Sequence, residues 1–395
     1  MTVGRVSARL ERIPGSATLA ISNRAREMRA EGRDVISFGA GEPDFPTPRH
    51  IVAAAESASG LDANHHYSAN AGLAPLRDAI VRYTRTYSGV EVTPGQVLVT
   101  NGAKQAIFQA FAALLDPGDE VLLPAPHWVT YPAGIDLAGG VTVSVPTAME
   151  DGFKVDVETL ERHRTDRTKL LVFVSPSNPT GSVYTAGEAR VIGEWAVANG
   201  IWVVTDEIYQ RLVYGAEEAA PSIVAETPGM EDYFIVNGVA KSFAMTGWRV
   251  GWMIGPSDVL GAAARLQSHA TGNVNNVAQV AALEALNGPQ DTVIAMREAF
   301  DKRRQTMITM LREADGVKLH EPEGAFYVFP NVEGLLGGRY PTADALAEGL
   351  LEEEGIAVVS GESFGAPGHI RLSYALSDDD LERGVSRMLA MFGRL

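Results

Sequence analysis

The middle of the chain alternates short apolar runs with longer amphipathic stretches, and this alternation limits the possible folds more than any other feature. Helical patterns, for example residues 103–115 and 186–199, separate the apolar runs. Short apolar runs bounded by turn residues are typical of strands that are buried on both faces. The alternation therefore predicts an α/β protein with a mostly parallel sheet that is covered by helices on both faces. The expected strands are residues 97–100, 120–123, 170–174, 201–205, 233–236 and 250–254.

Beyond residue 300 the pattern changes to that of a smaller α+β unit. Polar His369, Arg371 and Ser373 alternate with apolar neighbours, which predicts a half-buried strand. A last helix is expected to begin at Ser377, where Asp380 completes a capping box. The other elements expected here are strands at residues 324–330 and 356–360 and a helix at residues 342–353.

The length of 395 residues is sufficient for two or three domains. We expect a large domain of residues 46–300. We expect a smaller α+β domain to combine residues 1–45 with residues 301–395.

Composition excludes several classes of function. With 33 basic and 49 acidic residues, the formal net charge of −16 argues against binding to nucleic acid or to an anionic membrane. The chain has no cysteine, so disulfides, zinc–cysteine sites and thiol chemistry are impossible. The eight histidines show no metal-ligand spacing, and no metal site is expected. No apolar run approaches the ~20 residues that span a bilayer. The N-terminus lacks the apolar core of a secretory signal, so we expect a cytoplasmic location.

Polar residues follow the expected strands at the points where open α/β sheets bind ligands. Asn178 lies between two prolines that fix its backbone, and Asp206 follows a buried strand and requires a cationic partner. Lys241 lies among apolar residues, where desolvation lowers a lysine pKa and favours imine chemistry. The turn at residues 101–105 opens a helix whose free amides suit a phosphate. Trp128 either packs in the core or faces a ligand.

Three motifs occur in order along the chain: Ser-Asn-Pro-Thr-Gly, Asp-Glu-Ile-Tyr and Lys-Ser-Phe-Ala-Met-Thr-Gly-Trp-Arg. Together they resemble those of the pyridoxal-phosphate-dependent aminotransferases of fold type I, and most nearly the bacterial aspartate aminotransferase group. The resemblance extends from Gly41 to Arg371. It is highly specific for the cofactor, pyridoxal 5′-phosphate, and much less specific for the substrate.

The resemblance assigns roles around the cofactor ring. Lys241 would carry the cofactor as a Schiff base and move the proton between the substrate and the cofactor. Asp206 would pair with the pyridinium nitrogen and keep the ring protonated. Tyr209 and Asn178 would bond the phenolic oxygen of the ring, and Trp128 would stack on its face.

The resemblance also assigns the phosphate contacts. Gly102, Ala103 and Lys104 lie in the turn that cradles the phosphate in the family. Arg249 would bind the phosphate as a fork of donors. Tyr67 matches a tyrosine that reaches the phosphate of the neighbouring subunit, which implies a homodimer with active sites at the subunit interface.

Substrate recognition follows in the same way. Arg371 matches the arginine that clamps the α-carboxylate, and Gly41 borders that carboxylate. Lys104 either helps to hold an acidic side chain or is a solvated helix residue. The N-terminal segment with Ser16 and Thr18 would close over the substrate. The expected substrate contacts are therefore Gly41, Trp128, Asn178, Arg371, Lys104, Ser16 and Thr18.

The predicted activity is transfer of an amino group from L-aspartate to 2-oxoglutarate by a ping-pong mechanism. Aromatic, alanine or prephenate substrates are the nearest alternative. Prephenate is less favoured because Ile13 lies where relatives that use it carry a base, and the only base nearby is Arg12. Separately, the polar residues 268–276 differ from the Ser/Thr-Asn-Pro sequence that is commoner in the family, so the specificity of the pocket near them can differ. A lyase or synthase, or a non-catalytic regulator on the same scaffold, is a further alternative.

An acidic protein that binds dianions must concentrate positive charge locally. We expect Lys104, Lys241, Arg249 and Arg371 to form a positive cleft in a negative surface.

Overall fold

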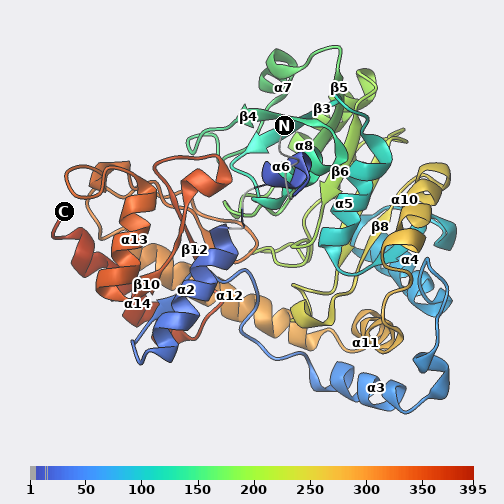
Figure 1. Ribbon diagram of the computed structural model, residues 1–395, viewed down its shortest axis with the longest axis horizontal. Coiled ribbons are helices and arrows are strands. Elements are labelled where there is room, and N and C mark those ends of the chain that lie inside the picture. Colours follow the sequence, from blue (N-terminus) through green and yellow to red (C-terminus); the bar gives the residue numbers. More distant parts are fainter. Residues whose placement is uncertain (1–5, 14, 16) are drawn as a thin grey trace.

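The computed structural model describes residues 6–13, 15 and 17–395, and its centre is a seven-stranded sheet with the order β2-β8-β7-β6-β5-β3-β4 (Figure 1). Strand β8 runs antiparallel to its neighbours β2 and β7, whereas the other pairs are parallel. The predicted α/β class with a mostly parallel sheet is confirmed. The strands are β2 (Val97–Thr100), β3 (Glu120–Ala125), β4 (Val141–Pro146), β5 (Thr168–Val174), β6 (Trp202–Asp206), β7 (Tyr233–Gly238) and β8 (Gly251–Ile254).

The edge strand β4 is the one strand of this sheet that the sequence analysis missed. It pairs only with β3, and most of its residues are exposed or half-buried. An edge strand with one solvent-exposed face lacks the continuous apolar run that is typical of the buried strands.

Alternate residues of the strands pack on opposite faces of the sheet, as the pleat requires. Val204 joins a cluster with helices on one face, and its neighbour Val203 joins a cluster on the other. The first face carries α5 (Ala103–Leu114), α6 (Thr130–Ala138) and α10 (Ser257–Ala270). The second carries α3 (Arg49–Ser59), α4 (Ala74–Ser88), α7 (Val157–His163), α8 (Ala186–Ala198), α9 (Ile223–Glu226) and α11 (Asn276–Asn287).

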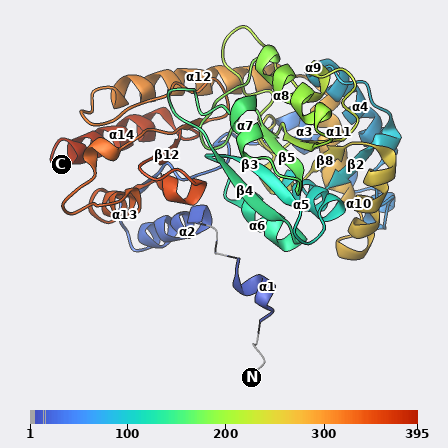
Figure 2. The ribbon, with the colours of Figure 1, turned by 90° about the horizontal axis from the view of Figure 1, so that it is seen from above.

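The C-terminal part has its own apolar cluster, and Figure 2 shows its helices gathered at one end of the molecule. Three short strands form an antiparallel sheet in the order β11-β12-β9, and β1 pairs in parallel with β10. This last pair ties the N-terminal segment to the C-terminal part. The strands are β1 (Ile36–Ser37), β9 (Tyr327–Val328), β10 (Ile356–Ala357), β11 (Val359–Ser360) and β12 (Ile370–Ser373).

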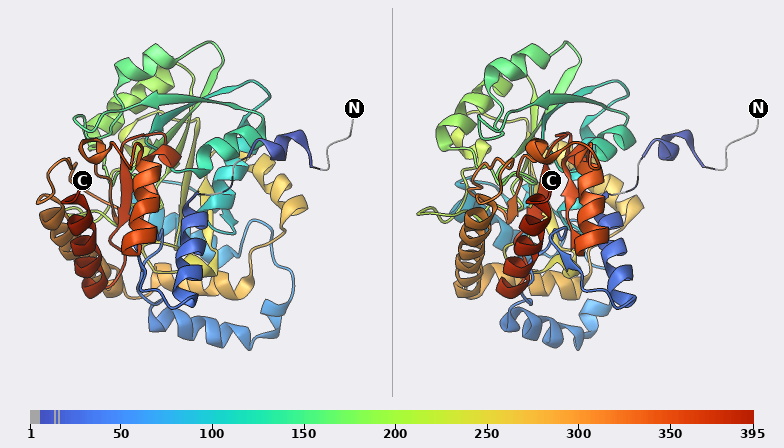
Figure 3. Two further views of the ribbon diagram at one scale, coloured as in Figure 1. Left: turned by 60° about the vertical axis from the view of Figure 1, so that its left-hand side comes forward. Right: turned by 90° about the vertical axis from the view of Figure 1, so that its left-hand side faces the viewer.

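Both views of Figure 3 place α2 beside the C-terminal helices. Helix α2 packs through Ala25 and Met28 on Leu351 and Ala357. The helices are α1 (Ala8–Glu11), α2 (Ala17–Ala30), α12 (Asp291–Leu311), α13 (Ala343–Glu354) and α14 (Asp378–Phe392). Short 3₁₀ turns are η1 (Asp62–His65), η2 (Pro94–Gln96), η3 (Thr246–Trp248), η4 (Glu333–Leu335) and η5 (Gly361–Phe364). In the described part of the chain, no helix combines the length and apolar character that crossing a membrane requires.

The C-terminal strands differ from the expected ones in length and burial. Only Tyr327–Val328 of residues 324–330 forms a strand, and residues 356–360 divide between β10 and β11, which belong to different sheets. The prediction of a half-buried strand at β12 is wrong, since Arg371 is 2% exposed and Ser373 is 1% exposed. The polar side of β12 faces other polar protein groups instead of water. The expected last helix is present, and the side chain of Ser377 accepts a hydrogen bond from the Asp380 amide.

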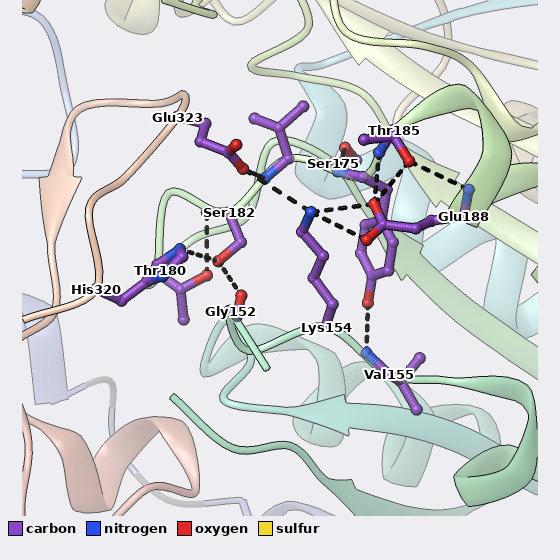
Figure 4. A network of polar contacts seen from close by, with 12 residues as sticks. Gly152, Lys154, Val155, Ser175, Thr180, Ser182, Thr185, Glu188, His320 and Glu323 are labelled. Carbon is purple, nitrogen blue, oxygen red and sulfur yellow. Dashed lines mark hydrogen bonds and ion pairs between the residues drawn. The ribbon is translucent and has the colours of Figure 1, made fainter. Parts of the chain in front are cut away.

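A network of polar contacts joins the loop after β4 to the segment that precedes β9 (Figure 4). The ammonium of Lys154 forms ion pairs with Glu188 at 3.0 Å and with Glu323 at 3.9 Å. The hydroxyl of Ser182 donates to the Gly152 carbonyl at 2.6 Å and lies 3.3 Å from Nε2 of His320. These contacts hold the loop of the Ser-Asn-Pro-Thr-Gly motif against the C-terminal part.

Gly181, the last residue of that motif, is required by the same packing. Its φ is +71°, and its carbonyl accepts hydrogen bonds from the amides of Glu323 at 2.9 Å and Gly324 at 2.8 Å. A Cβ at this position would lie 2.3 Å from the Cβ of Pro322. Only glycine allows the two segments to approach so closely.

We expect Gly181→Ala to lower the free energy of unfolding by about 2–3 kcal/mol, because it adds both a clash and a strained backbone. Gly187→Ala is the matched control, since Gly187 lies in α8 with nothing within 4 Å of an added Cβ. The control should be neutral or stabilising by up to about 1 kcal/mol. Urea unfolding of the two variants measures both effects, and equal stabilities would contradict the close-approach argument.

Candidate active site

A cleft of about 480 Å³ lies where the parallel strands end and the C-terminal part begins. Ligands bind at this edge in open α/β sheets because the strand ends and helix N-termini converge there. The cleft brings together most of the residues that the sequence analysis assigned to the site. They are Thr18, Gly41, Ala103, Lys104, Trp128, Asn178, Asp206, Tyr209, Lys241, Arg249 and Arg371.

Lys241 comes shortly after β7 and extends its amine into the cleft. The ammonium donates a hydrogen bond to the carbonyl of Gly41. Removal from water lowers the pKa of Lys241 to about 8, and the negative charge of Glu42 acts in the opposite direction. A lysine with this pKa has a substantial neutral fraction near neutral pH, so it can act as a nucleophile and as a base.

Asp206 ends β6 and is 4% exposed. Its carboxylate accepts hydrogen bonds from the Tyr131 hydroxyl at 2.8 Å and from the Ile208 amide at 3.1 Å. Burial raises the pKa of Asp206 to about 6, and these two donors oppose that shift. Among the described residues Asp206 forms no ion pair. A buried carboxylate without a cation leaves room for a positively charged ligand atom.

Tyr131 is a functional residue that the sequence analysis missed. It lies in the first turn of α6, three residues after Trp128, and the two rings meet edge to face with centroids 5.5 Å apart. A buried acid at a strand end requires hydrogen-bond donors. The need of Asp206 for a donor is the signal that could have identified Tyr131, which lies in the same Pro-rich segment as the predicted site residue Trp128.

Arg371 is a buried guanidinium without a carboxylate partner in the described chain. Its Nη1 donates to Oδ1 of Asn178 at 2.9 Å, and its Nη2 donates to the Gly39 carbonyl at 3.0 Å. Its Nε has no hydrogen-bond partner within the described residues. The guanidinium packs 4.5 Å from the ring centroid of Tyr327 and 5.0 Å from that of Phe364. Packing and hydrogen bonds thus fix the orientation of the guanidinium, which suits a carboxylate ligand.

Tyr209 and Tyr327 face each other beside Arg371. Their hydroxyl oxygens are 2.8 Å apart, and Tyr327 comes from β9. Burial raises the pKa of Tyr209 well above its ordinary value, so its hydroxyl stays neutral and can donate. Tyr327 could not be predicted as a site residue from the sequence, because it lies in a strand with no polar motif.

The start of α5 and Arg249 form a part of the cleft that suits an anion. Helix α5 begins after Gly102, and the guanidinium of Arg249 is so close that a Cβ on Gly102 would lie 2.4 Å from Nη2. Likewise, a Cβ on Gly251 would lie 2.4 Å from the Ala103 amide nitrogen. The absence of these two side chains leaves the free amides of the helix open next to a guanidinium. The ammonium of Lys104 lies 5.0 Å from the ring centroid of Trp128, and burial and then the charge of Arg249 lower its pKa.

Two described site residues, Gly102 and Tyr67, do not line the cleft, and a third predicted residue is not described. Gly102 directly precedes α5 and lies beside the Arg249 guanidinium. Tyr67 is 98% exposed and lies outside the cleft, beside residues 268–273. Ser16 lies outside the described residues, whereas Thr18, on the same segment, lines the cleft.

The charges around the cleft are mostly positive. The basic residues on its lining outnumber the acidic ones, as the sequence analysis predicts for this protein of net charge −16. Within the described residues, no three histidine or carboxylate side chains gather closely enough to hold a metal ion. The acidic lining residues are Glu42 and Asp206, and the basic ones are Arg26, Lys104, Lys241, Arg249 and Arg371.

Comparison with known proteins identifies the family. The family of class I and II aminotransferases matches residues 33–388. The chain belongs to this family. Two relatives support the assignment of this chain to the family. An aspartate aminotransferase from Streptomyces avermitilis is 56% identical over 394 residues, 98% of this chain and 96% of the relative. An aspartate/prephenate aminotransferase from Cereibacter sphaeroides is 44% identical over 98% of both chains.

A solved structure agrees with this assignment. Aspartate aminotransferase from Thermus thermophilus with maleate is 41% identical to this aminotransferase. The two structures match with a TM-score of 0.93 over 98% of this chain and 100% of the other. Both the resemblance and the fold predicted from the motifs are therefore confirmed.

We expect Tyr131→Phe to raise the pKa of Asp206 by about one unit, because it removes a hydrogen bond to the charged carboxylate. Difference infrared spectroscopy of the cofactor-free aminotransferase measures this pKa, with Asp206→Asn to assign the carboxyl band. Tyr327→Phe is the matched control, since the Tyr327 hydroxyl bonds Tyr209 instead. An unchanged Asp206 titration in Tyr131→Phe would contradict the role given to Tyr131.

Proposed function

We propose that this aminotransferase moves an amino group from L-aspartate to 2-oxoglutarate with pyridoxal 5′-phosphate as its cofactor. One observation carries the proposal: the cleft holds the amine of Lys241 together with a buried carboxylate, Asp206, and a buried guanidinium, Arg371, neither of which forms an ion pair within the described residues. A cationic ring nitrogen would satisfy the first of these charges and a substrate carboxylate the second.

The residues present fit the cofactor. Asp206 would hold the pyridinium nitrogen, and Tyr209 and Asn178 would bond the phenolic oxygen. Trp128 would cover the ring face. The phosphate would lie at the start of α5, where Arg249, Lys104 and the amides after Gly102 supply donors and positive charge. When bound, the cofactor supplies an electron sink for the charge left on the substrate Cα after loss of a proton.

The chain itself supplies binding and proton transfer. Arg371 binds the α-carboxylate of the substrate. Its hydrogen bonds to Asn178 and Gly39 fix the guanidinium in an orientation that suits this carboxylate. The neutral amine of Lys241 takes the proton from the substrate Cα and later returns one. Lys104 and Thr18 also line the cleft, and we assign them to the second carboxylate of the substrate. The relatives named aspartate aminotransferases, and the maleate in the Thermus structure, support a dicarboxylic substrate.

We include three further features in the proposal. The active unit is a homodimer in the cytoplasm, and the extreme exposure of Tyr67 supports its contact with the phosphate of the neighbouring subunit. The chain divides into a large domain of residues 46–300 and a small domain of residues 1–45 and 301–395. Helix α12 (Asp291–Leu311) crosses the proposed boundary at residue 300. Its Val293 packs in the apolar cluster of the large sheet, whereas its Phe300 packs in the C-terminal cluster.

A kinetic screen tests the activity. With aspartate and 2-oxoglutarate we expect formation of oxaloacetate and glutamate, and parallel double-reciprocal lines. Lys241→Ala should lower kcat by about 10⁴-fold, since the proton-transfer group is lost. Lys302→Ala, which removes an exposed lysine on α12, should leave kcat unchanged. A purified protein that prefers phenylalanine or alanine to aspartate would contradict the proposed substrate, and intersecting lines would contradict the ping-pong order.

Prephenate is the second candidate substrate, favoured by the name of the Cereibacter relative. The structure weakens this alternative: Arg12, the one base near the position used by such relatives, pairs with Asp136 on α6 at 3.2 Å. The same screen with prephenate as acceptor decides between the two. Release of ammonia from one amino acid without a keto acid would instead indicate a lyase.

The pKa of Lys241 sets a pH dependence. Because burial lowers this pKa to about 8, the neutral amine increases as the pH rises through 8. The rate at which cofactor-free protein captures pyridoxal phosphate should increase with it, as measured by absorbance. Glu42→Gln removes the charge that opposes the shift, so the midpoint should move to lower pH. Glu150→Gln, outside the cleft, is the control, and a midpoint near 10.5 in the unaltered protein would contradict the burial argument.

A further inference from the structure

We propose that Arg26 on α2 is a specificity-determining residue that attracts the second carboxylate of dicarboxylic substrates at the mouth of the cleft. The inference rests on the proposed function and adds a residue that neither the motifs nor the inner contacts of the site include.

The position of Arg26 follows from the helix geometry. Thr18, Ser22 and Arg26 all line the cleft, and they are spaced four residues apart on α2. Residues at this spacing lie on one face of a helix, with about 6 Å between successive ones. One face of α2 therefore presents two hydroxyls and a guanidinium to the cleft, with the guanidinium furthest from the helix start.

The side chain of Arg26 bends back toward the N-terminal end of α2. Its Nη1 donates to Oδ1 of Asn23 at 3.2 Å, and Asn23 lies three residues nearer the helix start. Helical side chains also tilt toward the N-terminus in general. The guanidinium therefore lies over the preceding turn of α2, at the level of Asn23, and it lines the cleft together with Thr18 and Ser22.

The charge of Arg26 is available to a ligand. Arg26 is exposed and forms no ion pair within the described residues. Arg24 on the same helix pairs with Glu352 at 3.0 Å, and Arg33 pairs with the same glutamate at 3.1 Å. Of these three arginines only Arg26 lines the cleft, and only its charge is unneutralised.

A free cation at this point has a physical purpose. The protein carries a net charge of −16, so its surface repels an approaching dianion. Arg371 has the α-carboxylate and Arg249 has the phosphate as expected partners, so Lys104 is the one other cation proposed for the second carboxylate, and Arg26 would act before it at the rim. A cation at the rim accelerates the capture of charged ligands and favours those that carry a second charge.

The test compares Arg26→Gln with Arg24→Gln in the holoenzyme. Both variants remove one positive charge from the same helix, but only Arg26 faces the cleft. At 20 mM salt we expect Arg26→Gln to raise the Kd of the unreactive dicarboxylate maleate, measured by calorimetry, by about three- to tenfold. The kcat/KM for aspartate should fall by the same factor with kcat unchanged. The loss should shrink to less than about twofold at 0.5 M salt, since an exposed charge is screened.

Two variants and one monocarboxylate complete the design. Arg26→Lys should retain most of the affinity for maleate, and Arg24→Gln should behave as the unaltered protein does. With alanine as donor, the effect of Arg26→Gln should be clearly smaller than with aspartate. The inference about Arg26 would be overturned if Arg26→Gln left the affinity for maleate unchanged, or if the two glutamine variants lost equal affinity. In either case, aspartate turnover by the unaltered protein would still support the proposed function. Absence of that turnover would instead overturn the proposed function itself.

Discussion

The structure depends on the cost of burying two charges that have no partner of opposite sign in the described chain. Asp206 ends the central strand β6 of the large sheet, and Arg371 lies on β12 of the C-terminal sheet. The hydrogen bonds to each charge come from neutral groups, among them Tyr131 for the acid and Asn178 for the guanidinium. The charge of Lys241 also favours the ionised form of Asp206, although the two groups form no ion pair. Such neutral groups reduce the penalty of burial without removing it. Under the proposed function, ligands of opposite sign would complete both charges, and the contacts around Gly181 hold the motif loop against the C-terminal part.

The sequence predicts the features that short segments determine. Buried strands of a parallel sheet are continuous apolar runs, so the core strands and the residues that follow them, such as Asp206, could be found without a structure. The edge strand β4 could not, because its exposed residues leave no such run. Tyr131 and Tyr327 were also missed, because each acts through a side chain that is distant in sequence. The hydroxyl of Tyr131 reaches an acid 75 positions away, and that of Tyr327 reaches a tyrosine 118 positions away.

The error at β12 has a general physical cause. Alternation of polar and apolar residues shows that one face of a strand meets a polar environment, but it does not show that the environment is water. On β12 the polar face meets Asn178 and Gly39, and Arg371 is fully enclosed. A strand with an arginine and a serine on one face therefore has two explanations, a solvated surface or a binding site. The strands β11 and β9, which flank β12 and are buried, exclude a solvated surface, but their positions are known only from the fold.

The charge distribution follows from the same constraint. A buried cleft that binds dianions must keep several cations apart from the carboxylates that would neutralise them. On α2 this separation is visible within one helix: Glu352 neutralises Arg24 on one side, while Arg26 on the cleft side has no acidic partner in the described chain. The net charge of −16 makes the separation more consequential, because every additional surface carboxylate repels the substrates that the cleft has to admit. An acidic aminotransferase thus benefits most from cations at the rim, where they act before the ligand reaches the inner donors.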